Sequence, residues 1–563
     1  MATAYRGACQ HTNGVNTVQA ILALNMLVGN IDWKGGMLGG TGGHLHEMGG
    51  TVPGQLSLGS QATSKRSTRG PQLTRVKSYF DSTMASALGE RLDRPTRRPW
   101  FPFAYNGNFQ EIIPSIEDRY PYPAGALLSY WNNLPYSSPA GAEAARRVLT
   151  DESLLPLHVC FDVEMGEMAS LADYILPDGT YFERWATPHN SPTILSKLSC
   201  FRSPVAGYYA AKRGGPANQT YWDALAARNL QSWDYTINWA TETGPFTIED
   251  IGIELMRRVA GGNLDDVASF GANAYYPSEA AKNAAVHPLH RNKLTSAWDW
   301  YWNILVNFAL ETGATAEADV LDMIHRIVER GGWFQDTALD GTNEYVGEYA
   351  KNKTGASAKG KSFHFFFEYA YPPTHPDWPG LRYTDPYSLK SYNPLPEVVP
   401  TLDAAGNAVR DPSEYALGCV TYKAMWHSQS RPASLPSLTV LEPENFVEMS
   451  TGDARLFGLR SGDLVKVTSA SNTQGVVGRV RATERIRPGV IAISHSRGRW
   501  EINGRPYKLD GQLTNSAPIR AAGVTCNPIL RLDPAVGNVT LQDPIGGSSS
   551  YYDTRVKVEK VDF

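Results

Sequence analysis

The strongest constraint on the fold lies in the C-terminal part of the chain, which repeats the pattern of short β-strands. Strand signatures occur at residues 464–469, 475–480, 489–494 and 554–561. A Ser-Gly-Asp turn at residues 461–463 leads into the first of them. Many short strands with few helices between them predict a closed β-barrel of roughly 140 residues.

A second stretch, residues 157–178, predicts part of a parallel sheet. An apolar run that ends at Asp162 has the pattern of a buried strand, a short helical turn follows, and residues 172–178 form another strand pattern. Strand, helix and strand in this order are typical of a βαβ unit, whose ligands bind beyond the C-terminal ends of the strands. The carboxylates expected there are Asp162, Glu164, Asp178 and Glu183. Paired carboxylates also suit acid–base catalysis such as glycoside hydrolysis, although most surface carboxylates have no such role.

Near the N-terminus, residues 15–28 predict a helix that ends close to Gly29. Thr12 and Asn13 stand where they can cap it, and the free N–H groups of a helix N-terminus suit an anion. A glycine-rich loop follows at residues 39–54, where the backbone can approach a bulky ligand closely. A capped helix followed by a flexible loop is the plainer alternative.

Shorter elements of both kinds are expected between these stretches. The pattern predicts a strand at residues 124–131 and helices at 140–149, 247–259 and 316–330. Residues 60–123 are basic and rich in proline, and we interpret them as a surface excursion. Aromatic runs at 298–302 and 363–367 are more typical of a core than of a substrate platform.

Composition excludes several classes of protein. The 52 Lys and Arg residues nearly balance the 56 Asp and Glu residues, so neither nucleic acid nor a membrane surface is expected as the main partner. The 5 cysteines include no CxxC pair, so the sequence predicts no disulfide framework, zinc site or iron–sulfur cluster. The first residues lack the pattern of a signal peptide, and the apolar run at residues 18–31 is shorter than the roughly 20 residues that span a bilayer.

A dense polar run stands just before the strand-rich region. Its five consecutive members are His427, Ser428, Gln429, Ser430 and Arg431. Ser and Gln both donate and accept hydrogen bonds, and Arg binds phosphate with two parallel bonds. The run therefore suits a polar, anionic ligand, and a solvated loop before a strand is the plainer alternative.

Three separated blocks together resemble the catalytic subunits of the molybdopterin oxidoreductases, the dimethyl sulfoxide reductase superfamily. The first is the His-Thr-Asn-Gly helix, which ends in Trp-Lys-Gly-Gly at residues 33–36. The second is Ala-Asp-Tyr-Ile-Leu-Pro-Asp-Gly-Thr-Tyr-Phe-Glu-Arg-Trp at residues 172–185, and the third is the run at residues 427–431. They occur in the family's order and span most of the chain apart from residues 55–120 and 210–400.

The resemblance implies an α/β protein, with parallel-sheet cofactor-binding domains followed by a C-terminal double-psi β-barrel. It implies a molybdenum bis(molybdopterin guanine dinucleotide) cofactor, and carboxylates can accept hydrogen bonds from the guanine edge. The cofactor-binding residues that it implies are His11, Thr12, Asn13, Glu164, Met165, Asp178, His427, Ser428, Gln429, Ser430, Arg431, His495 and Asn527.

The resemblance also divides the chain into five parts. Residues 1–60 are expected to complete a cofactor-binding α/β domain, 61–123 to form an irregular insertion, and 124–210 to bind the guanine side of the dinucleotide. Residues 211–410 are a helical and loop-rich elaboration, and 411–563 are the dinucleotide-binding barrel.

Within the superfamily, the blocks look most like the C-terminal part of the large subunit of tetrathionate reductase, with respiratory arsenate reductase and thiosulfate or polysulfide reductases as alternatives. The resemblance implies reduction of an oxidised sulfur compound in periplasmic anaerobic respiration. It also implies two partners, an iron–sulfur electron-transfer subunit plus a membrane anchor subunit. The family's N-terminal [4Fe–4S] segment and molybdenum ligand have no counterpart here. We therefore expect the C-terminal part of a catalytic subunit, inactive by itself, from a truncated or split reading frame.

Two other hypotheses remain at the level of sequence. One is a chain that only binds the cofactor, as half of a two-chain enzyme or as a degenerate paralogue. The other is an unrelated hydrolase that uses carboxylates such as Asp178 and Glu183.

Overall fold

The computed structural model describes most of the chain. The described residues are 1–4, 6–29, 95–101, 104, 108–184, 186, 198–202, 247–259, 287–289, 297–334, 385, 387–390, 392, 395–427, 429, 433, 435–502, 504–509 and 511–561. The chain forms two compact units, of which unit 1 comprises Met1–Gly29, Gly70–Leu176 and Phe363–Phe563. Unit 2 comprises Asn30–Arg69 and Pro177–Ser362.

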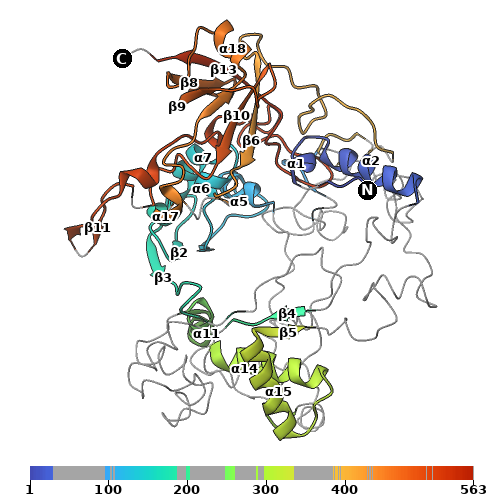
Figure 1. The fold of residues 1–563 in the computed structure, drawn as a ribbon, viewed down its shortest axis with the longest axis vertical. Helices are drawn as coiled ribbons and strands as arrows, with labels where there is room; N and C mark the ends of the chain where they lie inside the picture. The colour runs from blue at the N-terminus through green and yellow to red at the C-terminus, as the bar shows by residue number, and fades with distance from the viewer. Residues whose placement is uncertain are drawn as a thin grey trace. The chain divides into compact units, whose positions relative to one another are not determined.

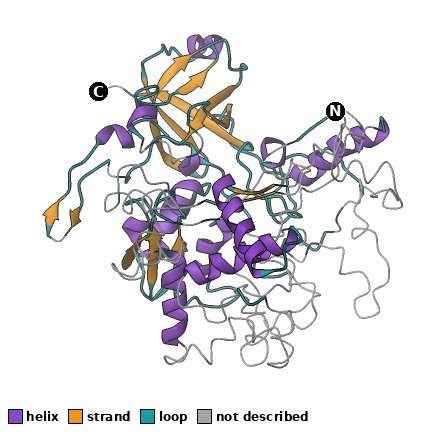
Figure 2. Ribbon diagram, turned by 60° about the horizontal axis from the view of Figure 1, so that its bottom comes forward, coloured by secondary structure: helices purple, strands orange, loops and turns teal. Residues whose placement is uncertain are grey.

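The C-terminal part of unit 1 is a closed barrel, in the order β10-β6-β13-β8-β9-β7 (Figures 1 and 2). Its strands are β6 (Leu417–Lys423), β7 (Val447–Met449), β8 (Leu464–Ser469), β9 (Asn472–Ala482), β10 (Val490–His495) and β13 (Thr554–Lys560). β10 pairs with β6 in parallel and β7 pairs with β9 in parallel, whereas the other neighbours are antiparallel. The predicted closed barrel is therefore confirmed.

Alternating side chains fill this barrel. Val465 and Val467 of β8 and Ile491 and Ile493 of β10 are fully buried in one apolar cluster. Burying each such side chain contributes roughly 1.5–3 kcal/mol to folding. The short helices α17 (Pro436–Thr439) and α18 (Thr451–Leu456), the 3₁₀ turns η9 (Pro518–Ala521) and η10 (Asn527–Ile529), and the strands β11 (Lys508–Leu509) and β12 (Gln512–Leu513) lie in the connections.

The middle segment of unit 1 is the predicted α/β region. Its sheet has the order β1-β2-β3, with β1 (Leu127–Tyr130), β2 (His158–Asp162) and β3 (Tyr174–Pro177). β1 and β2 are parallel, and α6 (Leu134–Ser137) and α7 (Gly141–Leu149) connect them. The other elements are η2 (Phe109–Glu111), α5 (Ile112–Glu117) and η3 (Ala169–Leu171). The apolar side of α7, with Ala145 and Val148, packs in one cluster with Ile116 and Cys160.

The N-terminal segment contributes the helices α1 (Arg6–Cys9) and α2 (Gly14–Leu27). Both are bound to a C-terminal loop that is far from them in the sequence. Asp543 Oδ2 accepts a hydrogen bond from the backbone N–H of Val15 at 3.0 Å. Tyr551 donates its backbone N–H to the carbonyl oxygen of Gln10 at 3.1 Å. Unit 1 is thus assembled from the beginning, the middle and the end of the chain.

Unit 2 is described mainly by its helices. These are α11 (Ile248–Val259), α14 (Ala297–Glu311) and α15 (Glu317–Arg330), with the antiparallel strand pair β4 (Leu198–Cys200) and β5 (Gly332–Phe334). The aromatic run at residues 298–302 falls in α14, where Tyr301 and Trp302 are buried in an apolar cluster, so the prediction of a core position is confirmed for them. The run at residues 363–367 lies outside the described residues.

One expectation about unit 1 is wrong. Residues 60–94 lie outside the described residues, but Arg98, Trp100 and Phe101 are at most 2% exposed rather than part of a surface excursion. Arg98 Nη2 lies 3.1 Å from Glu111 Oε2, and Trp100 Nε1 donates to the Tyr120 hydroxyl at 3.0 Å. The basic character of the stretch misled the prediction, because this arginine is buried against carboxylates.

No described helix combines the length and the apolar character that crossing a membrane requires. In the same described part of the chain, no group of three or more His, Cys, Asp and Glu side chains is arranged to hold a metal ion.

Candidate functional site: a cavity at the ends of two parallel strands

A cavity of about 730 Å³ lies in unit 1 at the C-terminal ends of β6 and β10. Lys423 is the last residue of β6 and His495 the last residue of β10, and both line the cavity. The other walls come from α1, from α6 and the residues that follow it, and from residues 549–552. Ligand pockets of small molecules and cofactors typically measure roughly 300–1,000 Å³, so the volume suits a cofactor-sized molecule.

The wall of this cavity carries positive charge only. Arg6 and Lys423 are its cationic residues, and no Asp or Glu occurs among the described residues that line it. The chain as a whole has a formal net charge of −4, so the absence of carboxylates from this wall is a local feature. Such a wall attracts anionic ligands.

His495, Gln429 and Asn527 were predicted to bind the cofactor, and all three line the cavity. The Nε2 atom of His495 is buried and makes no hydrogen bond with any described residue. Burial lowers the pKa of His495, and the charge of Lys423 lowers it further, so the imidazole is neutral at pH 7. Gln429 has a φ of 65°, a left-handed conformation that is uncommon for a residue other than glycine.

Asn527 also has a structural function. Its Nδ2 donates to the carbonyl oxygen of Tyr136 at 2.7 Å, and its own carbonyl oxygen accepts from the N–H of Ala140 at 2.7 Å. Asn527 therefore joins η10, which lies in the chain between β10 and β13 of the barrel, to the α6–α7 region.

His427 is 1% exposed and is not among the residues that line the cavity. Its Nε2 atom lies 3.3 Å from the carbonyl oxygen of Leu438 and 3.4 Å from Nη2 of Arg497. The carbonyl requires Nε2 to donate and the guanidinium requires it to accept, so only one of the two hydrogen bonds can exist at a time. Burial, followed by the charge of Arg497, lowers the pKa of His427. Ser428, Ser430 and Arg431 lie outside the described residues, and their predicted role stays a prediction.

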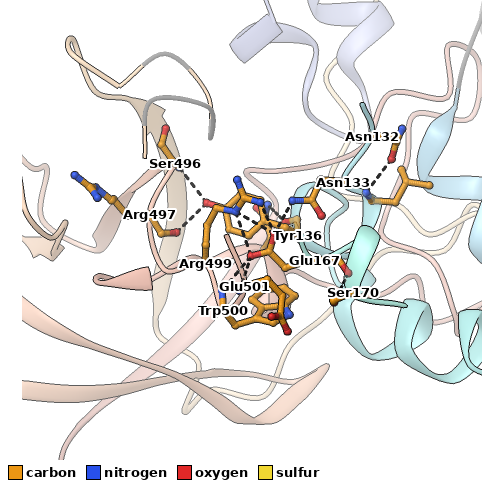
Figure 3. A network of polar contacts seen from close by, with 12 residues as sticks. Asn132, Asn133, Tyr136, Glu167, Ser170, Ser496, Arg497, Arg499, Trp500 and Glu501 are labelled. Carbon is orange, nitrogen blue, oxygen red and sulfur yellow. Dashed lines mark hydrogen bonds and ion pairs between the residues drawn. The ribbon is translucent and has the colours of Figure 1, made fainter. Parts of the chain in front are cut away.

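A buried ion pair joins the α/β segment to the loop that follows β10 (Figure 3). Glu167 is completely buried, and its Oε2 accepts from Nε of Arg499 at 3.0 Å and from Nδ2 of Asn133 at 2.6 Å. Its Oε1 accepts the backbone N–H of Trp500 at 3.0 Å and that of Glu501 at 3.2 Å. Burial raises the pKa of Glu167, but the hydrogen bonds and charge of Arg499 outweigh it, so that the pKa lies below its ordinary value.

Tyr136 of α6 links the same network to the cavity. Its hydroxyl donates to the carbonyl oxygen of Arg497 at 2.8 Å and accepts from the N–H of Ser496 at 3.2 Å, and Figure 3 shows this ring beside Arg499. Tyr136 and Ser496 both line the cavity. The ion pair therefore fixes the loop that forms one side of the cavity wall.

Glu164 and Met165 were predicted to lie at the guanine end. Glu164 is exposed, and the carbonyl oxygen of Met165 accepts the N–H of Ile502 at 2.9 Å. Neither residue lines the cavity, and the buried carboxylate of this turn is that of Glu167. The predicted role of Glu164 and Met165 in cofactor binding stays a prediction.

Asp178 belongs to unit 2 and caps a helix there. Its Oδ1 accepts the N–H of Ile248, the first residue of α11, at 3.1 Å. Its Oδ2 lies 3.3 Å from Nη1 of Arg184. Its proposed contact with guanine also stays a prediction.

His11, Thr12 and Asn13 lie at the start of α2. His11 Nδ1 is 2.8 Å from Asp553 Oδ1, and the N–H of Thr12 donates to Asp553 Oδ2 at 2.9 Å. The side chain of Asn13 stands at the N-cap position but makes no capping hydrogen bond. The expected capping by Thr12 and Asn13 is therefore wrong, because Asp543 of the C-terminal loop accepts from the first turn instead. Whether these residues bind the cofactor stays a prediction.

The sequence interpretation did not assign Lys423, Tyr136, Arg497 or Arg499 to the site. A usable signal existed for the arginines, because Ser-Arg-Gly-Arg-Trp at residues 496–500 directly follows an apolar strand pattern. Ligands bind beyond the carboxyl ends of parallel strands, and the parallel pairing of β6 and β10 places residues 496–500 there.

The barrel region that contains β6 and β10 matches a known protein family. Residues 416–534 match the family described as the Molydopterin dinucleotide binding domain. The A subunit of selenate reductase from Mesobacillus selenatarsenatis is 30% identical over 99% of this chain and 51% of its own length. The A subunit of tetrathionate reductase from Salmonella typhimurium is 24% identical over 99% of this chain and 51% of its own length.

A further relative, the A subunit of tetrathionate reductase from Archaeoglobus fulgidus, is 24% identical over 94% of this chain and 46% of its own length. Among solved structures, acetylene hydratase from Pelobacter acetylenicus matches at 15% identity and a TM-score of 0.41, over 87% of this chain and 52% of that chain. The chain spans about half the length of these curated relatives. On the dinucleotide-binding match and these sequence relatives, the chain belongs to the molybdopterin oxidoreductases of the dimethyl sulfoxide reductase superfamily.

Proposed function

We propose that unit 1 holds a molybdopterin guanine dinucleotide in the cavity at the ends of β6 and β10, as the cofactor-binding part of a reductase catalytic subunit. The observation that carries this proposal is a cofactor-sized cavity with no carboxylate among its described lining residues, at strand ends within residues 416–534, the region of the family match. A dinucleotide carries a diphosphate, and a wall with Lys423 and Arg6 complements its charge.

The residues that line the cavity fit a molybdopterin guanine dinucleotide. Nε2 of His495 is buried without a partner among the described residues, which is costly unless a ligand supplies one. The amide of Gln429 both donates and accepts, as the heteroatom edge of a pterin requires. His495, Gln429 and Lys423 would hold the cofactor, and the metal bound to it would supply the redox chemistry.

In this proposed function, the protein's own residues would bind the cofactor and hold it in its orientation. The ion pair of Glu167 and Arg499 keeps the loop after β10 in place, and Tyr136 bridges that loop to α6. The parallel pairings of β6 with β10 and of β7 with β9 support a double-psi connection of the barrel.

For the substrate, we propose an oxidised sulfur compound such as tetrathionate, with selenate as a second candidate. The two relatives named for tetrathionate reductase support the first, and the relative at 30% identity, named for selenate reductase, supports the second. The proposal places the reaction in anaerobic respiration in the periplasm. Its partners would be an iron–sulfur electron-transfer subunit plus a membrane anchor subunit.

Cofactor content tests the proposal directly. The protein is produced in cells that make molybdopterin guanine dinucleotide, and its pterin is released, oxidised and measured by fluorescence together with GMP. We expect bound dinucleotide, and we expect His495→Ala with Gln429→Ala to lower the content at least several-fold. Gln474→Ala, on the exposed part of β9, is the matched control and should leave the content unchanged.

An unchanged pterin content in the His495 and Gln429 variant would place the cofactor elsewhere. The substrate is tested separately. The chain is produced in cells together with the part of a relative that it does not match, and the oxidation of reduced methyl viologen is followed with tetrathionate, selenate and arsenate. Turnover of arsenate alone would contradict the proposed substrate class.

A further inference from the structure

We propose that the end of the barrel that carries α18 is a docking surface for an acidic segment of a partner protein. The residues of this surface, which we call the α18 surface, are exposed and combine two neighbouring apolar side chains with a rim of arginines. They are Arg455, Leu456, Phe457, Arg460, Arg485 and Arg487. This inference goes beyond the proposed function and does not depend on it, because none of these residues lines the cavity.

The α18 surface is formed by α18 and the turns that lie next to it. Oδ2 of Asp453 in α18 accepts the backbone N–H of Gly489 at 2.8 Å, which joins the helix to the turn before β10. Oγ of Ser461 accepts the backbone N–H of Ala482 at 2.9 Å, which joins the turn after α18 to the end of β9. Residues that are separated in the sequence are therefore held together at one end of the barrel.

This surface and the cavity lie at opposite ends of the barrel. Gly489 stands directly before β10, whereas His495, the last residue of β10, lines the cavity. β10 is 6 residues long and spans about 20 Å. Figure 1 shows α18 at the end of the barrel, at the top of the view. A partner can therefore bind at α18 while the cavity stays accessible.

The carboxylates close to this surface already have partners within the chain. Oδ2 of Asp463 lies 3.2 Å from Nζ of Lys560 and accepts the backbone N–H of Arg460 at 2.9 Å. Oε1 of Glu484 accepts a hydrogen bond from the hydroxyl of Thr451. None of the arginine side chains of the α18 surface forms an ion pair with a described residue. Their guanidinium groups are therefore exposed cations that an acidic partner can neutralise.

Leu456 and Phe457 give the α18 surface an apolar centre. Leu456 is 79% exposed and Phe457 is 39% exposed. The buried residue of α18 is Ala454, so the helix packs on the barrel through a small side chain. Exposed apolar residues are common when they stand alone, but an adjacent pair surrounded by arginines has the composition of a protein interface, which combines an apolar centre with a polar rim.

The rim favours a protein partner over a lipid surface. Its guanidinium groups bind carboxylates with two parallel hydrogen bonds, and arginine is enriched at protein interfaces whereas lysine is depleted. A helix that binds a membrane surface needs an apolar face broad enough to be buried among the lipid headgroups. α18 has only 6 residues and exposes a single large apolar side chain, that of Leu456. The geometry therefore fits a polypeptide segment with several Asp or Glu residues around an apolar side chain.

Cross-linking in the native cells tests the α18 surface with the full chain. The photoreactive analogue p-benzoylphenylalanine replaces Phe457 or, as a control, the exposed Thr473 at the other end of β9. The cross-linked peptide is then identified by mass spectrometry. We expect position 457 to form an adduct that position 473 does not form, with a peptide in which Asp and Glu outnumber Lys and Arg.

Variants that remove charge show whether the arginines hold the partner. Arg455→Gln with Arg487→Gln should lower the yield of the adduct roughly tenfold, because two exposed charge-assisted contacts are lost. Arg146→Gln with Arg410→Gln removes the same charge from exposed positions elsewhere in unit 1 and should leave the yield unchanged. Arg455→Lys with Arg487→Lys keeps the charge and should retain most of the adduct. All three proteins should unfold at the temperature of wild type, because they exchange exposed side chains.

The proposal fails if position 457 forms no adduct, if its cross-linked peptide is not acidic, or if Arg455→Gln with Arg487→Gln leaves the yield unchanged. Flotation of the purified chain with vesicles of phosphatidylglycerol or of phosphatidylcholine tests a lipid partner. We expect binding to neither vesicle. Binding to the anionic vesicles that depends on Arg455 and Arg487 would assign the surface to a membrane and overturn the choice of a protein partner.

Discussion

Asp533 shows how a single buried carboxylate can set the response of this protein to pH. The side chain is 2% exposed and accepts the backbone N–H groups of Ala404 and Ala535, each at 2.8 Å. Burial raises the pKa of Asp533 to about 6, and these hydrogen bonds oppose the rise without cancelling it. A protonated carboxyl group still accepts hydrogen bonds, so protonation relieves the cost of the buried charge while the loop keeps its anchor.

We predict that Asp533 makes unit 1 more stable at acidic than at neutral pH. The pKa in the folded state, about 6, exceeds the value of about 3.9 expected in the unfolded chain, so the folded state binds the proton more tightly. The contribution is therefore full below pH 4 and is lost as the pH rises through 6, by about 2–3 kcal/mol in total. Urea unfolding of wild type and Asp533→Asn at pH 4.5 and 7.5 measures it.

Other carboxylates also titrate in this range, so the informative quantity is the difference in unfolding free energy between the two proteins. Wild type should lose stability relative to Asp533→Asn as the pH rises. A difference that stays constant between the two pH values would show that Asp533 has an ordinary pKa.

At the level of single residues, the sequence predicted which kinds of side chain form the site better than it predicted which individual residues do. His495, Gln429 and Asn527 do line one cavity. In the turn after β2, however, the prediction chose Glu164, which is exposed, rather than the buried Glu167. That turn is too short to show a periodicity, so nothing in the local pattern indicates which carboxylate faces Arg499.

Among the elements, the connection after β10 depends on a glycine. Gly498 has a φ of +68°, and a Cβ atom there would lie 2.4 Å from the backbone carbon of Val524. The buried Asn445 fixes the same place, because its Nδ2 donates to the carbonyl oxygens of Ser494 and Val524 at 2.6 and 2.8 Å. The loop that carries Arg497 and Arg499 is thus held against the barrel at close range.

We predict that Gly498→Ala destabilises unit 1 far more than Gly458→Ala. Gly458 has the same φ of +68° but open space around it, so its substitution reports the backbone strain alone, on the order of 1 kcal/mol. Gly498→Ala adds a collision with backbone atoms, which must move. Thermal unfolding of the two variants compares them, and equal losses of stability would contradict the close approach.

Most elements could be predicted from the sequence because their patterns are long. The helices expected at residues 15–28, 140–149, 247–259 and 316–330 correspond to α2, α7, α11 and α15, each within one or two residues. The prediction missed the long helix α14, because its aromatic run was interpreted only as part of a core. It also missed β6 and short elements such as α5 and η2. Local propensity is weak in such short segments, and packing decides their structure.

At the scale of the molecule, the contacts that define unit 1 join residues far apart in sequence. Glu167 and Arg499 are separated by 332 positions, and His11 and Asp553 by 542. Neither pair can be inferred from one sequence, because a local pattern carries no information about distant partners. The division into five parts stays a prediction, and each compact unit of the structure combines segments that are separated along the chain.

We predict that Glu167→Gln destabilises unit 1 strongly, because it leaves the guanidinium of Arg499 buried without a counter-charge. Removing one partner of a buried ion pair typically costs about 3–5 kcal/mol. Replacing both groups, as in Glu167→Gln with Arg499→Met, should recover part of this loss. Denaturant unfolding followed by circular dichroism measures all three proteins, and a double variant no more stable than Glu167→Gln would show that the buried charge is not the cause.

The place of β13 in the barrel has a consequence for the synthesis of this protein. β13 lies between β6 and β8, and its residues 554–560 are the last strand of the barrel to be made. The barrel therefore cannot close during synthesis until residue 560 has emerged from the ribosome. The hydrogen bonds that the start of α2 donates to Asp543 and Asp553 also cannot form before those residues have been made. Because Ser549, Tyr551, Tyr552 and both strand ends line the cavity, the cavity is complete only after these residues have been synthesised and the barrel has formed.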